Sequence, residues 1–202
     1  MARSSYHHGN LRQALVEATV KLIEDSGPQG FTLAEAARLA GVSAAAPYRH
    51  FAGRDELLEE VARQGFEEFA DRLEAAFDDG RPRPLTAFLR MGQAYLAFAA
   101  ERRGFYIAMF ESGISIAGNS ALQQASERAR GVLVRGAESL FVARPGPRPP
   151  AGMIADHIWA LSHGVVELFG RGKPGARSPI APADMLESGA LIYLRGLGII
   201  PD

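Results

Sequence analysis

Apolar side chains recur at intervals of three and four residues along most of this chain, which is the spacing of an amphipathic helix. The first such stripe consists of Leu11, Leu15, Ala18 and Leu22, and the stop signal Gly27-Pro28 follows it. No run of residues alternates between apolar and polar with the period of two that marks a half-buried strand. The pattern therefore predicts an all-α fold.

Residues 32–51 predict two short helices joined by a tight turn. Thr32 is a good N-cap, and Glu35 lies three residues further on, where its carboxylate can accept a hydrogen bond from the N–H of the cap. Gly41 suits the backbone angles of the turn, and Ser43 can cap the second helix. That helix is expected to end in a polar and aromatic run that suits phosphates and base edges, Tyr48-Arg49-His50-Phe51.

Pro47 conflicts with this second helix. If Ser43 is the cap, Pro47 falls at the fourth helical position, where its missing N–H costs one backbone hydrogen bond. Proline also disfavours helical geometry at the residue before it, which is Ala46. A cap one residue later or a tighter first turn would each relieve the conflict, and the sequence leaves both possibilities open.

The remainder of the chain also predicts helices. A long one starts after Gly53, ends before the breaker at 79–82, and measures about 35 Å at 1.5 Å per residue. This length exceeds what a three-helix core needs, so its far end must pack against later elements. Those elements are helices expected over 84–101, 105–111, 119–142, 150–170 and 182–196.

The last two predicted helices carry apolar groups around much of their circumference, over 153–169 and 185–200. A helix that is apolar on more than one face is buried on more than one face. Pairing with a second copy of the chain would bury both helices in a four-helix interface, and ordinary packing in the core is the alternative. The residues expected at such an interface are Ile158, Val165, Leu168, Leu191 and Leu194.

Composition narrows the class of protein. The 202 residues include no cysteine, which excludes disulfides and a cysteine-based zinc site and fits a reducing cytoplasm. No apolar run approaches the ~20 residues that span a bilayer, and the first residues lack the apolar core of a signal peptide. The formal net charge is −1, so a protein of this kind that binds DNA must concentrate its positive charge locally.

Other chemistry finds little support. His7-His8 has no third ligand nearby, and a solvated arm that reaches toward DNA explains the pair better than a metal site. Ser162-His163 lacks the strand-turn-helix elbow of a nucleophilic serine, and the glycines between 102 and 119 do not form a phosphate loop. We therefore expect no enzymatic activity, no metal and no cofactor.

One group of aromatic and polar residues in the second half is a candidate for an effector pocket. Its members are Phe88, Tyr95, Phe105, Tyr106, Met109, Phe110, Trp159 and His163, with Glu111 as a further polar candidate. The same residues would equally suit a filled helical core. The sequence does not separate these two possibilities, and it does not identify a ligand.

The motifs in both halves resemble a known family. The patterns G-F-T-L-x-x-x-A-x-x-A-G-V-S and Y-x-H-F-x-x-R-x-E-L run from Gly30 to Leu57 and resemble the DNA-binding domain of TetR-type transcriptional regulators. The later run IWALSHGVVEL resembles the C-terminal domain named for its Trp-His-Gly signature. The resemblance implies a helix-turn-helix domain over 8–56 and a helical ligand-binding and dimerisation domain over 57–202. It also implies a homodimer that acts as a repressor and leaves a palindromic operator when a small effector binds.

The same resemblance assigns DNA contacts to eight residues. Phosphate and backbone contacts are expected from Thr32, Tyr48, His50 and Arg54, and contacts with base edges from Ser43, Ala44, Ala45 and Ala46. Many relatives carry larger polar groups at the base-edge positions, whereas an alanine offers only its methyl group. Direct reading by hydrogen bonds is therefore expected to be sparse, with DNA shape taking a larger share. A helical ligand sensor without DNA binding and a small helical enzyme are the alternatives.

Overall fold

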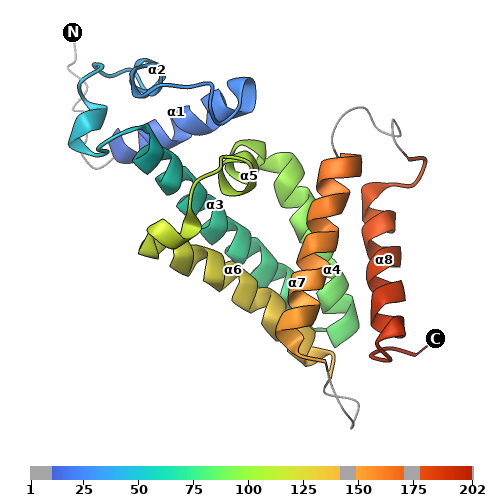
Figure 1. Ribbon diagram of the computed structural model, residues 1–202. Coiled ribbons are helices and arrows are strands. Elements are labelled where there is room, and N and C mark those ends of the chain that lie inside the picture. Colours follow the sequence, from blue (N-terminus) through green and yellow to red (C-terminus); the bar gives the residue numbers. More distant parts are fainter. Residues whose placement is uncertain (1–10, 142–148, 171–177, 202) are drawn as a thin grey trace. The chain divides into compact units, whose positions relative to one another are not determined.

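The computed structural model describes residues 11–141, 149–170 and 178–201, and every regular element in these ranges is a helix (Figure 1). This confirms the predicted fold class. His7 and His8, for which we predicted an arm that reaches toward DNA, lie outside the described residues. No helix within the described ranges is both long and apolar enough to cross a membrane.

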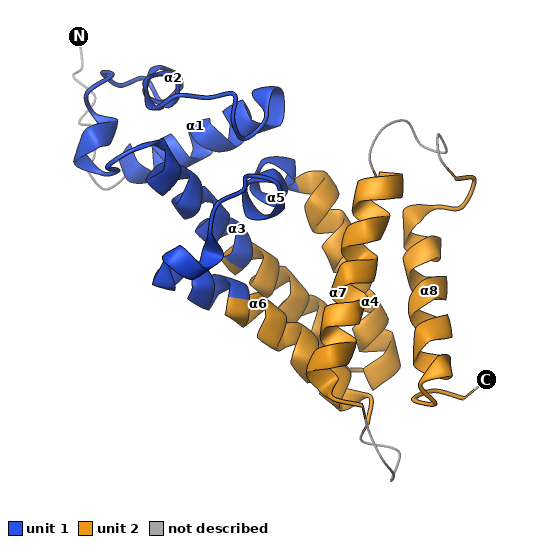
Figure 2. Cartoon of the chain, in the orientation of Figure 1, with its two compact units in different colours: residues 1–66, 102–126 blue, residues 67–101, 127–202 orange. Residues whose placement is uncertain are grey.

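The chain divides into two compact units (Figure 2). Unit 1 consists of residues 1–66 and 102–126, and unit 2 consists of residues 67–101 and 127–202. The predicted domain boundary between residues 56 and 57 stays a prediction. Packing, however, groups residues 102–126 with the N-terminal helices, which no local sequence signal indicated.

Unit 1 contains the expected N-terminal helices and a later one. Its elements are α1 (Leu11–Ser26), α2 (Leu33–Leu39), the 3₁₀ turn η1 (Pro47–Arg49), the first half of α3 (Arg54–Phe77), α5 (Arg103–Phe110), η3 (Ile116–Gly118) and the first turns of α6 (Ser120–Ser139). The stripe predicted on α1 is buried at Leu11, Leu15 and Ala18, whereas Leu22 is half-buried. The other main members of the core of unit 1 are Phe31, Phe51, Leu57, Leu58, Val61 and Phe66.

A glycine allows α5 to pack closely on α1. A Cβ atom built on Gly104 would lie 2.5 Å from the carbonyl oxygen of Val20, a distance that atoms in proteins do not tolerate. The Gly104 N–H also donates a 2.9 Å hydrogen bond to the carboxylate of Glu24. Further along, the Gln29 side chain donates to the carbonyl oxygen of Ser112 at 3.2 Å. These contacts hold α5 and the residues after it to the N-terminal helices.

Unit 2 is a helical bundle. Its elements are the second half of α3, the 3₁₀ turn η2 (Asp78–Gly80), α4 (Pro84–Glu101), most of α6, α7 (Ala151–Val165), the π-helical turn η4 (Val166–Gly170) and α8 (Pro182–Gly196). Helices α4, α7 and α8 lie side by side (Figure 1). The observed bounds of α4 and α8 equal the predicted ranges 84–101 and 182–196.

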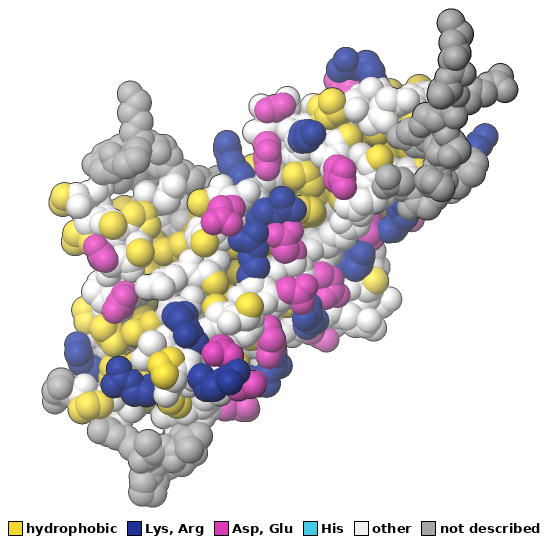
Figure 3. Space-filling view, turned by 180° about the vertical axis from the view of Figure 1, so that it is seen from behind, with side chains coloured by type: hydrophobic (Ala, Val, Ile, Leu, Met, Phe, Trp, Pro, Cys, Tyr) yellow, Lys and Arg dark blue, Asp and Glu magenta, His cyan; other side chains and the backbone are white. Residues whose placement is uncertain are grey.

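Aromatic rings fill the middle of unit 2, and ion pairs cover part of its surface. The ring of Phe69 lies 5.1 Å from those of Tyr95 and Phe98 and 6.1 Å from that of Trp159. On the outside, Arg128 of α6 pairs with two carboxylates of α3, Glu67 at 2.8 Å and Asp71 at 2.6 Å. On the face shown in Figure 3, basic and acidic side chains are likewise interspersed rather than gathered in one basic field.

Candidate nucleic-acid interface

Helix α2 begins with the predicted capping box. The Thr32 hydroxyl accepts a 3.2 Å hydrogen bond from the Glu35 N–H, and the Glu35 carboxylate accepts one of 2.8 Å from the Thr32 N–H. The hydroxyl also donates to the same carboxylate at 2.9 Å. Thr32 is exposed, so a phosphate that approaches it would compete with Glu35 for this hydroxyl proton.

Helix α2 ends at the predicted glycine turn. Gly41 has a φ of +73°, which glycine adopts without steric cost. Its N–H donates to the Arg38 carbonyl at 3.2 Å, and the Val42 N–H donates to the Ala37 carbonyl at 2.9 Å. This pair of bonds is the Schellman arrangement, which satisfies the last carbonyls of a helix while the chain reverses. The turn of the predicted helix-turn-helix is therefore confirmed.

The helix predicted after this turn is not formed as expected. Residues 44 and 45 form a turn, and the helical element between this turn and residue 52 is the short 3₁₀ turn η1. An α-helix capped by Ser43 would need an N–H at position 47 to bond the Ser43 carbonyl, and Pro47 has none. The Ser43 carbonyl instead accepts from the Ala46 N–H at 2.9 Å, and Pro47 is the first residue of η1. The structure thus adopts the tighter turn, although Ala46 itself keeps helical angles.

We call residues 43–51 the recognition segment. Its buried side chains are Pro47 and Phe51, which anchor it to the core of unit 1. Tyr48 between them is 64% exposed and, with Leu39, is one of the two exposed large hydrophobic side chains among the described residues of unit 1. Of the other expected contact residues, Ser43, Ala44 and Ala45 are exposed, whereas Ala46 and His50 are half-buried. The segment therefore presents one aromatic ring, the exposed side chain of Arg49 and a row of small side chains.

Arg54 occupies a different environment from the one expected of a phosphate contact. Its guanidinium stacks 4.8 Å from the centre of the Phe31 ring and donates to the carbonyl oxygens of Pro28 and Phe31 and to the side chains of Gln29 and Asp55. These bonds tie the start of α3 to the loop between α1 and α2. A phosphate contact by Arg54 stays a prediction, and it would have to replace some of these partners.

The structure divides the predicted effector residues between the two units. Phe105, Tyr106, Met109 and Phe110 belong to unit 1, where the first three are buried and Phe110 packs edge-on against Phe66. Phe88, Tyr95, Trp159 and His163 belong to unit 2. There the Tyr95 hydroxyl lies 3.2 Å from Nδ1 of His163, and the Tyr95 side chain is only 2% exposed. Most of the set is thus packed core, and its role as a pocket stays a prediction.

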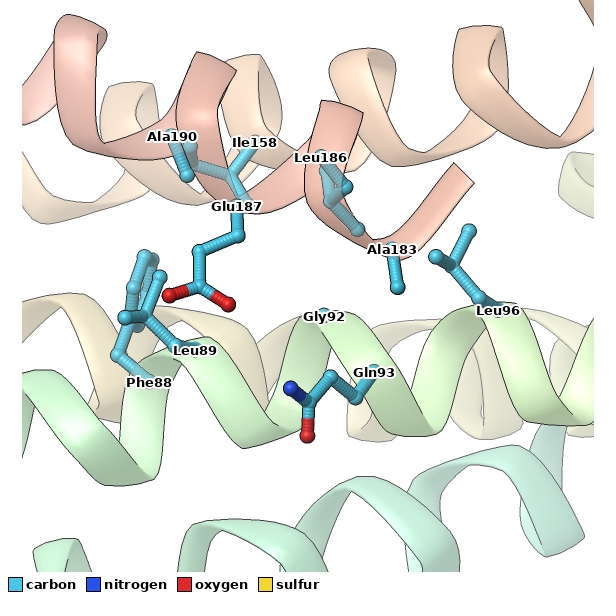
Figure 4. A pocket seen from close by; sticks show the side chains of 10 residues that line it. All are labelled: Phe88, Leu89, Gly92, Gln93, Leu96, Ile158, Ala183, Leu186, Glu187 and Ala190. Atoms are coloured by element: carbon cyan, nitrogen blue, oxygen red, sulfur yellow. The ribbon is translucent and has the colours of Figure 1, made fainter. Parts of the chain in front are cut away.

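Unit 2 has an apolar pocket that the sequence reasoning located only in part. It encloses about 320 Å³, including its open mouth, between α4, α7 and α8 (Figure 4). Phe88 is the only lining residue from the predicted effector set, and the polar groups of the lining are Gln93 and Glu187. Three α8 residues in the lining, Ala183, Leu186 and Ala190, recur at helical spacing, which is the signal that the sequence analysis missed.

The residues expected at a dimer interface also differ in exposure. Ile158, Val165 and Leu194 are buried within unit 2 itself, so they already serve as core and present little surface to a partner. Leu191 is half-buried and Leu168 is 52% exposed. Ile192, which we did not predict, is 69% exposed on α8. The apolar surface of α8 and the turn after α7 is therefore carried by Leu168 and Ile192.

These features define a class of protein, namely a helix-turn-helix DNA-binding domain followed by a helical bundle. The sequence matches the family model for bacterial regulatory proteins of the tetR family over residues 15–61. It also matches the model for a tetracyclin repressor-like C-terminal domain over residues 88–190, which alone is half of the chain. The chain belongs to the TetR family and is a transcriptional regulator with an N-terminal DNA-binding domain, not an enzyme.

One curated relative and several solved structures resemble the chain. The HTH-type transcriptional regulator BetI 2 of Chromohalobacter salexigens is 39% identical over 75 residues, which is 36% of each protein, so the match spans about a third of that relative. A protein of unknown function from Rhodococcus sp. RHA1 superimposes with a TM-score of 0.82 at 28% identity, covering 96% of this chain and 99% of the other.

Two further structures share the fold at lower identity. The TetR family transcriptional regulator PfmR from Thermus thermophilus has a TM-score of 0.61 at 21% identity, covering 91% of this chain and 98% of its own. The fatty acid degradation regulator FadR from Bacillus halodurans has a TM-score of 0.73 at 11% identity, and the match covers 96% of this chain and 97% of FadR. At these identities the similarity supports the fold alone.

Proposed function

We propose that the protein is a dimeric repressor that binds a palindromic operator through unit 1 and leaves it when a small molecule binds unit 2. The observation that carries the proposal is the recognition segment, in which buried Pro47 and Phe51 anchor the backbone on both sides of the exposed Tyr48. An amphipathic ring on an anchored backbone can pack on a sugar or a thymine methyl group of the DNA. Because operator DNA is chromosomal, the proposed site of action is the cytoplasm.

The base-edge positions support a particular mode of recognition. Exposed Ala44 and Ala45 offer methyl groups but no hydrogen-bonding groups beyond their backbone. The operator would therefore be recognised through Tyr48, through backbone groups and through the shape of the DNA, with few hydrogen bonds between side chains and bases. Operator variants that change groove width should accordingly affect binding as strongly as changes of single contacted bases.

Features of both units support the proposal of a dimer. The recognition segment is short, so one copy would bind a half-site weakly, and two copies related by a two-fold axis would read two half-sites about one helical turn apart. Exposed Leu168 and Ile192 supply apolar surface on unit 2 for the contact between copies.

For the effector, the proposed site is the pocket between α4, α7 and α8. Its lining is mainly apolar with a single carboxylate, Glu187, at an exposed position. An uncharged or weakly polar molecule suits such a lining, because an anion would meet Glu187 and would have few partners for its charge. Release of DNA requires only that the molecule bind the DNA-free state more tightly, and a difference of ~1–3 kcal/mol lowers operator affinity ~5–150-fold.

The decisive experiment measures binding of the full-length protein to duplex DNA from directly upstream of its own gene. Fluorescence anisotropy and footprinting should show a two-fold symmetric protected site. Tyr48→Ala should weaken this binding at least tenfold, by about the 1.4 kcal/mol that one buried aromatic contact is worth. The control is Leu39→Ala, which removes a 48% exposed side chain of α2 outside the recognition segment. Equal binding by Tyr48→Ala and wild type would refute the recognition assignment.

A matched pair of variants tests the effector site. Ala183→Phe should fill the mouth of the pocket, whereas Ala181→Phe adds the same ring at an exposed position outside the lining. Compounds from a screen of small apolar molecules, detected by Trp159 fluorescence, should bind the wild type and Ala181→Phe but not Ala183→Phe. Compounds that bind all three proteins equally would place the effector site elsewhere, and compounds that leave operator affinity unchanged would refute the coupling.

A further inference from the structure

Glu60 is the one charged side chain that is buried among the described residues, with an exposed fraction of 6%. It lies on α3 in unit 1, and its carboxylate accepts from three side chains. Arg63 donates to both oxygens through Nε at 2.8 Å and Nη2 at 2.9 Å, and Gln64 donates at 2.8 Å. The third donor, Nη1 of Arg12 on α1, lies 2.6 Å from Oε1. The DNA contacts expected from the sequence include neither Glu60 nor Arg12.

Arg12 connects this carboxylate to the recognition segment. It is the second residue of α1, and its guanidinium lies 5.1 Å from the centre of the Phe51 ring. Phe51 is the last residue of the recognition segment and directly follows His50. The Arg12 side chain remains 46% exposed, so the charged group lies between the buried ring on one side and solvent on the other.

The Glu60 carboxylate has more hydrogen-bond donors around it than a buried carboxylate needs. A buried charge must be paired and its lone pairs satisfied, and the bidentate Arg63 with Gln64 already does most of this. The Nη1 atom of Arg12 pairs with Glu60. Within the described ranges, Glu60 is the one acceptor that the Arg12 guanidinium contacts. A guanidinium has five N–H donors in a planar fork that matches a phosphate, so most of the fork remains available at the exposed side.

We propose that Arg12 contacts a phosphate of the DNA backbone and that Glu60 is the positioning residue that holds it there. The inference rests on the proposed DNA binding and deepens it. Held by Glu60 and by the Phe51 ring, the Arg12 side chain is ordered before DNA arrives, so little conformational entropy is lost on binding. The contact carries no base information, and it fixes how the recognition segment is placed on the duplex.

The first test compares Arg12→Ala with Arg63→Ala in the full-length protein. Both variants remove one positive charge that pairs with Glu60. Binding to upstream duplex DNA and to a duplex of mixed sequence is titrated from about 50 to about 200 mM salt. Arg12→Ala should weaken both affinities roughly tenfold and lower the slope of log K against log salt by about 0.9 for each protomer bound. Arg63→Ala should leave that slope near the wild-type value.

The second test uses Glu60→Gln, because long-range electrostatics and loss of positioning predict opposite changes in DNA affinity for this variant. The substitution removes a negative charge near the DNA, so long-range electrostatics alone would tighten binding. Loss of positioning instead weakens binding roughly threefold, because Arg12 must then be ordered when DNA binds. Thermal melting of all three variants identifies any that are partly unfolded at the assay temperature, and only the folded fraction enters the binding constant.

Each outcome decides between the roles. A lower slope for Arg12→Ala alone, together with weaker binding by Glu60→Gln, supports the proposal. Equal slopes for Arg12→Ala, Arg63→Ala and wild type would overturn the phosphate contact and leave a tie between α1 and α3. Tighter binding by Glu60→Gln would overturn the positioning role. Wild-type protein that binds neither duplex would overturn the proposed function itself, which distinguishes that failure from the other two.

Discussion

Acid should destabilise this protein in a pH range that Glu60 sets. Burial by itself raises the pKa of the Glu60 carboxyl, but the hydrogen bonds from Arg63, Arg12 and Gln64 and the charge of Arg63 together outweigh it and lower the pKa from 4.5 to about 2. A carboxyl group whose pKa is lower in the folded state stabilises that state above its unfolded pKa. The stabilisation is therefore complete above about pH 5 and is lost as the pH falls from about 4.5 to about 2.

The size of the effect follows from the two pKa values. A difference of about 2.5 units at 1.36 kcal/mol per unit gives about 3 kcal/mol in the free energy of unfolding near neutral pH. Between about pH 7 and about pH 3, the linkage relation removes about 2 kcal/mol of this contribution. In Glu60→Gln the contribution is absent at every pH. The free-energy difference between wild type and Glu60→Gln should therefore shrink by about 2 kcal/mol over this interval.

Urea unfolding followed by circular dichroism, at one fixed protein concentration, measures this difference at each pH. Many other carboxylates protonate in the same range, so the comparison with the variant isolates Glu60. Glu17→Gln serves as control, because it removes an exposed carboxylate of α1 whose only described hydrogen bond is a 3.4 Å one from Gln13. This variant should follow the wild type at every pH. If wild type and Glu60→Gln lose stability in parallel between pH 5 and pH 2, the assignment of the effect to Glu60 is wrong.

Three further predictions, two of them with a control variant, test other parts of the molecule. Gly104→Ala should cost roughly 1–3 kcal/mol in the free energy of unfolding, because its Cβ would lie 2.5 Å from the Val20 carbonyl oxygen, whereas Gly164→Ala, with nothing within 4 Å, should be neutral or stabilising by up to ~1 kcal/mol. Equal melting curves for the two variants would contradict the packing of α5 on α1. Arg54→Ala should cost roughly 1–3 kcal/mol by cutting the tie to the 28–31 loop, and the predicted phosphate contact would also lower the salt slope of DNA binding by about 0.9 per protomer. An unchanged slope would show that Arg54 serves protein acceptors alone. Ile192→Asp should convert the proposed dimer to monomer in analytical ultracentrifugation. Ile180→Asp replaces an isoleucine that is 53% exposed but lies outside α7 and α8, and it should leave the proposed dimer intact. A dimeric Ile192→Asp would remove α8 from the interface.

The sequence by itself determined the helix ends and turns that are fixed by residues close to one another in the chain. The capping box of Thr32 and Glu35 and the positive φ of Gly41 are as predicted, because caps and turns are decided by hydrogen bonds within a few residues. The same holds for α4 and α8, each of which begins at a proline, Pro84 and Pro182. Periodicity also identified the all-helical fold, since one apolar stripe per helix is a local property.

Pro47 marks the limit of this local reasoning. The sequence showed that a proline at this position is incompatible with a regular helix from Ser43, but it did not show which alternative the chain adopts. The outcome depends on Pro47 and Phe51, which are both buried in the core of unit 1 and so fix the path of the segment between them. Packing against distant residues therefore decided the shape of the recognition segment.

Tertiary structure alone decided which predicted residues share a site. Helical spacing shows that Tyr106 and Tyr95 are apolar-face residues, but only packing places the first in unit 1 and the second beside His163 in unit 2. In the sequence, nothing distinguishes Glu60 from a surface carboxylate. Only the tertiary structure places Arg12, 48 positions earlier in the chain, beside it. The physical reason is common to these cases. Periodicity and caps depend on neighbours within one or two turns, whereas burial and pairing depend on which helices meet, and that is set by the side-chain shapes of the whole core.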